Sequence, residues 1–146
     1  MEQSMSEKSA AIFSNPLDGV RVEAYGTNII RIPGEVSGAA MSILEVILRP
    51  GDGTPFHLHE REDETFRVLS GTVGFWCGDK HQRLATDGIA FLPRRIPHRI
   101  ENVGDDEARV MVILTPGGFE QFFVEIASGR GEAPETIAER FGLRFL

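Results

Sequence analysis

Three of the four histidines in this chain lie in two short segments whose residue types suit one metal ion. His57 and His59 stand two positions apart, Glu64 follows shortly after them, and His98 belongs to the second segment. The set offers three imidazoles and one carboxylate. A mixed nitrogen and oxygen ligand set can hold a redox-active or Lewis-acid metal and leave positions open for a substrate. The sequence therefore predicts a metal centre built from these four residues.

The spacing of the candidate ligands indicates the elements that must carry them. Side chains on a strand alternate between two faces, so His57 and His59 point the same way if they lie on one strand. Glu64 is the first residue of the run Glu64–Ser70, and on a strand its side chain would share a face with the apolar Phe66 and Val68. An unpaired buried carboxylate is costly or becomes protonated, and a shared cation would supply its partner. Only a closed sheet would bring the distant His98 to the same point.

The first of the two segments resembles the first motif of the cupin superfamily, which reads G-x5-H-x-H-x4-E-x6-G. Gly51, His57, His59, Glu64 and Gly71 match every fixed position of that motif. The agreement covers both the ligand types and their spacing, which makes the resemblance specific.

The second segment is similar to the second cupin motif, G-x5-P-x-G-x2-H-x3-N, through Pro93, His98 and Asn102. Two positions depart from it. Asp87 stands where the family has a glycine, with Gly88 one place later, and Arg95 replaces the glycine between the proline and the histidine. Both departures concern turn geometry, whereas the four ligand positions are intact. The resemblance spans roughly residues 40–125.

The resemblance implies an all-β double-stranded β-helix, a jelly-roll barrel with short C-terminal helices. The tail, with Leu114–Phe123 and Ile137–Leu143, looks like that of small single-domain cupins described as quercetin-dioxygenase-like. We expect one divalent transition metal per chain, iron first, with manganese, nickel, copper or zinc as alternatives. Glu64 would serve as a ligand, as the catalytic base, or as both.

The function implied by this resemblance is a metal-dependent dioxygenase acting on a small organic substrate such as a flavonol, a β-diketone or a catechol. Related cupins are isomerases, cyclases, lyases or decarboxylases in which the metal polarises a carbonyl without oxygen. A small-molecule-binding module without catalysis is the third alternative. The sequence does not separate these three classes.

Local patterning independently favours an all-β barrel, because short runs rich in valine, isoleucine and phenylalanine recur between turn residues. We expect a single domain over residues 1–146, with a mobile arm at 1–12, the barrel at 18–116 and a helical segment at 117–146. The predicted strands are 20–25, 28–32, 42–49, 64–69, 72–77, 82–85, 89–92, 98–102 and 108–114. Helices are expected at 118–127 and 134–141, the first with Phe119, Phe122, Phe123 and Ile126 on one face.

Composition restricts the partners. The chain has 15 basic and 22 acidic residues, a net charge of -7, and no basic cluster, which disfavours nucleic acid and anionic membranes. Its single cysteine, Cys77, cannot form an internal disulfide and is expected to pack in the core. No signal peptide or membrane-spanning run is visible, so we expect the cytoplasm. We also expect a homodimer through the segment 20–32, because an exposed edge strand needs protection.

Five further residues have two interpretations each. Asn102 is expected to hydrogen-bond within a turn or beside the ligands rather than to bind metal. His81 is expected on an exposed hairpin rather than as a fifth metal ligand. Arg94 and Arg95 are interpreted as solvated residues at the rim, with recognition of a substrate anion as the alternative. Glu45 faces away from its apolar neighbours. The register of its strand decides whether its side chain faces the cavity or solvent, and both interpretations stay open.

Overall fold

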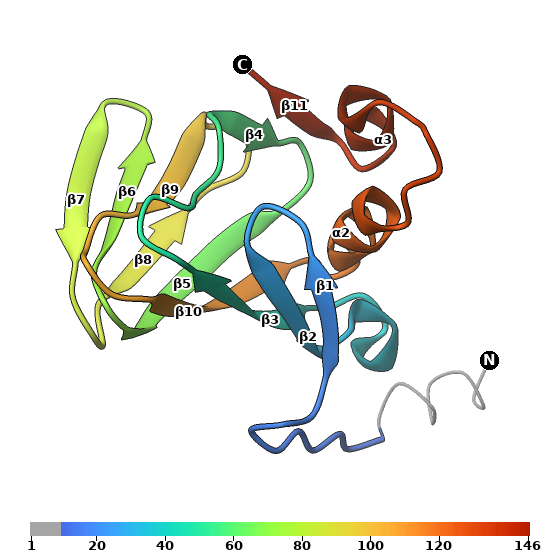
Figure 1. Ribbon diagram of the computed structural model, residues 1–146. Helices are drawn as coiled ribbons and strands as arrows, with labels where there is room; N and C mark the ends of the chain where they lie inside the picture. The colour runs from blue at the N-terminus through green and yellow to red at the C-terminus, as the bar shows by residue number, and fades with distance from the viewer. Residues whose placement is uncertain (1–9) are drawn as a thin grey trace.

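Short strands with alternating burial form most of the structure, a computed structural model that describes residues 10–146 (Figure 1). In β10, for example, Ala108, Val110, Val112 and Leu114 are buried and the residues between them are not. Of the predicted arm at residues 1–12, residues 1–9 lie outside the described residues. The strands are β1 (Val20–Glu23), β2 (Thr27–Ile32), β3 (Ser42–Leu48), β4 (His57–His59), β5 (Asp63–Ser70), β6 (Val73–Cys77), β7 (Lys80–Leu84), β8 (Ile89–Leu92), β9 (His98–Asn102), β10 (Ala108–Thr115) and β11 (Leu143–Phe145).

The strands form two antiparallel sheets whose inner faces enclose the core. One sheet has six strands in the order β1-β2-β3-β10-β5-β8, and the other has five in the order β11-β4-β9-β6-β7. Fully buried side chains such as Leu48, Val68, Val73 and Val110 come from both sheets. The predicted all-β jelly roll is confirmed, and its first sequence motif spans both sheets, with β4 in one and β5 in the other.

The C-terminal segment contains two helices and one strand. The helices are α2 (Glu120–Ala127) and α3 (Pro134–Arg140), and a short 3-10 helix, η1 (Gly34–Ser37), precedes β3. Helix α2 packs against β1 and α3. The prediction of a helical segment at 117–146 did not include β11, which pairs with β4 so that Leu143 lies opposite His59 and Phe145 opposite His57. The chain end therefore borders the candidate site.

The two residues that depart from the second motif have backbone conformations that glycine adopts most readily. Asp87 has φ 72° and Arg95 has φ 66°, in the left-handed region that glycine adopts most readily. Gly71 of the first motif has φ 84°, and a Cβ there would lie 2.8 Å from the Cα of Ala108. Asp87 and Arg95 therefore adopt left-handed turn conformations although both carry a Cβ.

Glu45 lies on the outer face of the six-stranded sheet, opposite its cavity-lining neighbours Leu44 and Val46. It is buried there between two arginines, with Arg109 Nη1 donating to its carboxylate at 3.2 Å and Arg31 contacting the other oxygen. The structure thus resolves the open register in favour of a surface ion cluster. Neither α-helix within residues 10–146 has the length and apolar character needed to cross a bilayer.

Candidate metal centre

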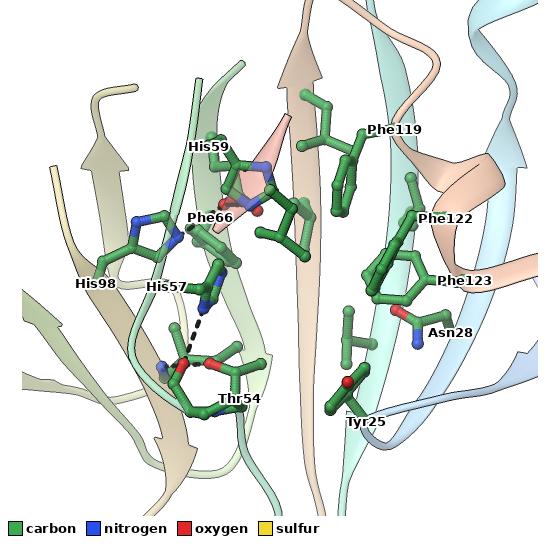
Figure 2. A pocket seen from close by; sticks show the side chains of 18 of the residues that line it. Tyr25, Asn28, Thr54, His57, His59, Phe66, His98, Phe119, Phe122 and Phe123 are labelled. Carbon is green, nitrogen blue, oxygen red and sulfur yellow. Dashed lines mark hydrogen bonds and ion pairs between the residues drawn. The ribbon is translucent and has the colours of Figure 1, made fainter. Parts of the chain in front are cut away.

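The four predicted ligands converge at one end of the barrel interior. Their candidate ligand atoms all lie within 4.8 Å of one another, and all four residues are buried. Strand β4 contributes His57 and His59, β5 begins with Asp63 and Glu64, and His98 opens β9 directly opposite His57. Figure 2 shows the three histidines side by side at one side of a pocket. Closure of the two sheets therefore brings together residues that are 41 positions apart in the sequence, from His57 to His98.

Each imidazole is oriented by an acceptor outside the cluster. His57 Nδ1 donates to the carbonyl of Pro55 at 2.8 Å, and His98 Nδ1 donates to the carbonyl of Ile96 at 3.1 Å. Because a carbonyl only accepts, the proton of a neutral ring sits on Nδ1 and the lone pair on Nε2. The Nε2 atoms face the cluster. Such support fixes the tautomer and the orientation of a ligating histidine.

The third support, for His59, is a residue that sequence reasoning missed. Glu62 is buried, and its Oε1 lies 3.2 Å from His59 Nδ1. The sequence places Glu62 inside the charged run Glu60–Asp63, between the candidate strand of His57 and His59 and the run that begins at Glu64. Nothing in that run distinguishes Glu62 from its neighbours except its position three residues after His59.

Glu64 lies between two of the histidines. Its Oε1 is 2.9 Å from Nε2 of both His59 and His98. Although burial is the largest single effect on Glu64 and favours the neutral acid, the His59 and His98 imidazoles hold the pKa of Glu64 well below its usual range. Burial also disfavours the charged form of His59, yet Glu64 and Glu62 raise the pKa of His59 to about 9.

The pKa of His57 shifts in the opposite direction to that of His59. Burial, together with the neighbouring His98 and His59, lowers the pKa of His57 to about 4, so its Nε2 lone pair is free at neutral pH. The cluster therefore presents one carboxylate, one neutral imidazole on His57, one imidazole on His59 that holds a proton against the carboxylate, and the imidazole of His98. This donor set fits a divalent transition metal, which would take the place of the proton.

The cluster opens onto a cavity of about 70 Å³, enough for several water molecules. Most of its lining is aliphatic or aromatic, including Phe66. The polar side chains besides the four candidate ligands are Tyr25, Asn28 and Thr54. The predicted apolar face of the first C-terminal helix supplies one wall through Phe119, Phe122 and Phe123 (Figure 2).

The remaining candidate residues lie away from this cavity. Arg94 pairs with Asp63, and Arg95 is exposed, so neither lines the cavity. His81 is exposed and stacks on Trp76 at 4.3 Å between ring centroids. Asn102 is buried and holds a turn, because its Nδ2 donates to the carbonyls of Leu48 and Asp106 at 2.8 Å each.

Residues 44–114 match the family model described as the cupin domain. A polyketide synthase protein, TcmJ of Streptomyces glaucescens, is 28% identical over 90 residues, which are 62% of this chain and 60% of that protein. The quercetin 2,3-dioxygenase of Aspergillus japonicus is 23% identical over 112 residues, 72% of this chain and 32% of the enzyme. The chain thus spans at most 60% of the length of these two relatives.

Among solved structures, the polyketide cyclase RemF of Streptomyces resistomycificus superposes with a TM-score of 0.63 at 19% identity. The superposition covers 73% of this chain and 80% of RemF. At this level of identity the likeness concerns the fold. It places the barrel described above among known structures of the same architecture.

Proposed function

The chain belongs to the cupin superfamily, and from that premise we propose that it is a metal-dependent enzyme that dioxygenates a small phenolic or enolisable substrate. The observation that carries this proposal is the convergence of three oriented imidazoles and one carboxylate on an apolar cavity with an aromatic wall. A solvated surface site would need neither the buried acceptors behind each ring nor the apolar wall.

Each part of the site has a proposed role. His57, His59, Glu64 and His98 would hold one divalent transition metal per chain, with iron as our first candidate. When bound, the metal would supply a Lewis-acid and redox centre for a substrate oxygen or dioxygen. Glu64 either remains a ligand or accepts the proton of a substrate hydroxyl, since its Oε1 already faces two ionisable partners. The aromatic wall excludes water and strengthens these electrostatic interactions.

A second candidate reaction is cyclisation without oxygen. TcmJ is named as a polyketide synthase protein and RemF as a polyketide cyclase, and both are similar to this chain. The same four residues would then hold a metal that polarises a substrate carbonyl, and Glu64 would accept a proton from the adjacent carbon. Both candidates need a substrate oxygen that faces the histidines. The cytoplasmic location and the absence of nucleic-acid and membrane partners stay predictions from the sequence.

Elemental analysis and an oxygen electrode test the proposal together. We expect about one transition-metal ion per chain in the wild type, its loss in His98→Ala, and its retention in His81→Ala, a matched control on an exposed histidine. We expect oxygen consumption with flavonols, β-diketones or catechols. Full metal content in His98→Ala would overturn the site.

The remaining outcomes separate the alternatives. Turnover of a polyketide-like substrate under anaerobic conditions would replace dioxygenation by cyclisation. Tight binding of a small molecule by the metal-loaded protein, with no turnover in either condition, would favour a binding module.

A further inference from the structure

Asn28 places an unsatisfied amide oxygen in the wall of the cavity. The residue lies on β2 and is only 1% exposed. Its Nδ2 donates to the carbonyl of Ala24 at 2.6 Å, and this bond fixes the orientation of the amide because a carbonyl cannot donate. Within residues 10–146, no group donates a hydrogen bond to Asn28 Oδ1.

This oxygen is turned toward the cavity rather than enclosed by protein. Among the described residues, Ser42 Oγ is the one fully enclosed side-chain polar atom that lacks a partner, so Asn28 Oδ1 reaches open space. Asn28 lines the cavity. Figure 2 shows it across the pocket from the three histidines, with its oxygen on the side of the cavity. A ligand in the cavity therefore meets a fixed acceptor opposite the candidate metal ligands.

An aromatic surface connects the two ends of the cavity. Phe119 contacts His59 edge-on at 4.4 Å between centroids and stacks on Phe122 at 5.1 Å. Phe122 lies nearly parallel to Tyr25, with 6.3 Å between centroids and 14° between planes. A planar ring that lies on this surface would have one edge toward the histidines and the other toward Asn28.

We propose that the substrate is a small planar ring compound with an enol or phenol oxygen at the histidine end and a hydroxyl group that donates to Asn28 Oδ1 at the other. This inference rests on the proposed metal-dependent function and names the substrate class of that site. Asn28 determines specificity and takes no part in the chemical step. A ligand that lacks the hydroxyl leaves the amide oxygen desolvated and unpaired, which weakens binding about 10- to 100-fold.

Two hydroxypyranones provide a matched pair of probes. Kojic acid and allomaltol carry the same metal-chelating hydroxy-ketone, and differ in that kojic acid has a hydroxymethyl group where allomaltol has a methyl group. Calorimetric titration of the zinc-loaded protein measures the Kd of each without redox chemistry. We expect kojic acid to bind at least about tenfold more tightly than allomaltol, because only kojic acid can donate to Asn28 Oδ1.

Variants then assign the preference to this residue. In Asn28→Ala the ratio of the two Kd values should fall to about one, mainly through weaker binding of kojic acid. Gln121→Ala, which removes an exposed amide on α2, should keep the wild-type ratio. If the alanine variant does not fold, Asn28→Ser takes its place; it also removes the amide oxygen, so the ratio should again fall to about one.

The outcomes separate this inference from the function on which it rests. Equal binding of both probes to the wild type, or a preference that persists in Asn28→Ala, overturns the role of Asn28 and leaves the metal-dependent function intact. If neither probe binds the zinc-loaded protein more tightly than the zinc-free protein, the metal-chelating substrate is wrong, and this inference falls with it.

Discussion

Nδ1 of His59 lies 3.2 Å from Oε1 of Glu62, and both residues are buried. The imidazoles of His57 and His98 donate to backbone carbonyls, which no substitution of a side chain can remove. Glu62 is thus the support that mutagenesis can test. It also carries a charge, which raises the pKa of His59 and would strengthen its bond to a cation.

Replacing Glu62 with glutamine should weaken metal binding while preserving the fold. The amide oxygen can still accept from His59 Nδ1, but the negative charge is lost, so we expect metal affinity to fall by roughly 10- to 100-fold. Competition with a chelator of known affinity measures the change. Glu107→Gln, an exposed carboxylate away from the cluster, is the control. Equal affinity in both variants would show that Glu62 does not support the centre.

The metal-free protein should be most stable near pH 6.5, the ordinary pKa of histidine. The pKa of His57 is lowered to about 4 in the folded chain. Its contribution to folding stability is therefore complete above about pH 6.5 and is lost as the pH falls toward 4. The pKa of His59 is raised to about 9, so its contribution is complete below about 6.5 and is lost as the pH rises through 9. Thermal unfolding of chelator-treated protein from pH 4 to 9 measures both limbs.

Single replacements separate the two limbs of that profile. His57→Ala should reduce the loss of stability between about pH 6.5 and 4.5, above the range in which protonation of Glu64 adds to it, and His59→Ala should reduce the loss between about pH 6.5 and 9. A profile that keeps both limbs in both variants would assign the pH dependence to other groups.

Arg95→Gly should stabilise the protein. Arg95 has φ 66°, a conformation that costs a residue with a Cβ about 1 kcal/mol relative to glycine, and its side chain is exposed. The greater freedom of glycine in the unfolded chain offsets part of this gain, so we expect an increase of about 0.5 kcal/mol in the free energy of unfolding. Denaturant titration measures it. Arg95→Ala keeps the backbone cost and should leave stability nearly unchanged; stabilisation by alanine equal to that by glycine would contradict the backbone explanation.

The homodimer remains a proposal, with β1 as the contact. This strand is one edge of the six-stranded sheet, and Val20 on it is 60% exposed. We expect light scattering to give twice the chain mass of 16.1 kDa, and Val20→Lys to shift the mass toward the monomer, because charges on an edge strand oppose pairing. Ile89→Lys at the other edge, β8, should leave the dimer intact. A monomeric wild type would overturn the proposal.

Several features of this protein follow from local sequence alone. The two-residue period of a strand puts His57 and His59 on one face, and the apolar alternation of β5 places Glu64 on the inner side. The bounds of the central strands and of both C-terminal helices agree closely with expectation, because short apolar periods and turn residues report local geometry. Asp87 and Arg95 depart from the motif in residue type, and both have a positive φ, the conformation that glycine favours.

Other features were decided only when distant segments met. No local pattern separates the buried Glu62 from the less buried charges around it, because its burial depends on the packing of the barrel end. The contact of Phe119 with His59 joins residues that are 60 positions apart. The pairing of β11 with β4 brings Leu143 opposite His59, 84 positions away. The free oxygen of Asn28 faces the cavity because β2 lies on the six-stranded sheet while the histidines of β4 and β9 lie on the other. Side-chain periodicity specifies which residues share a face, whereas sheet closure decides which faces come together.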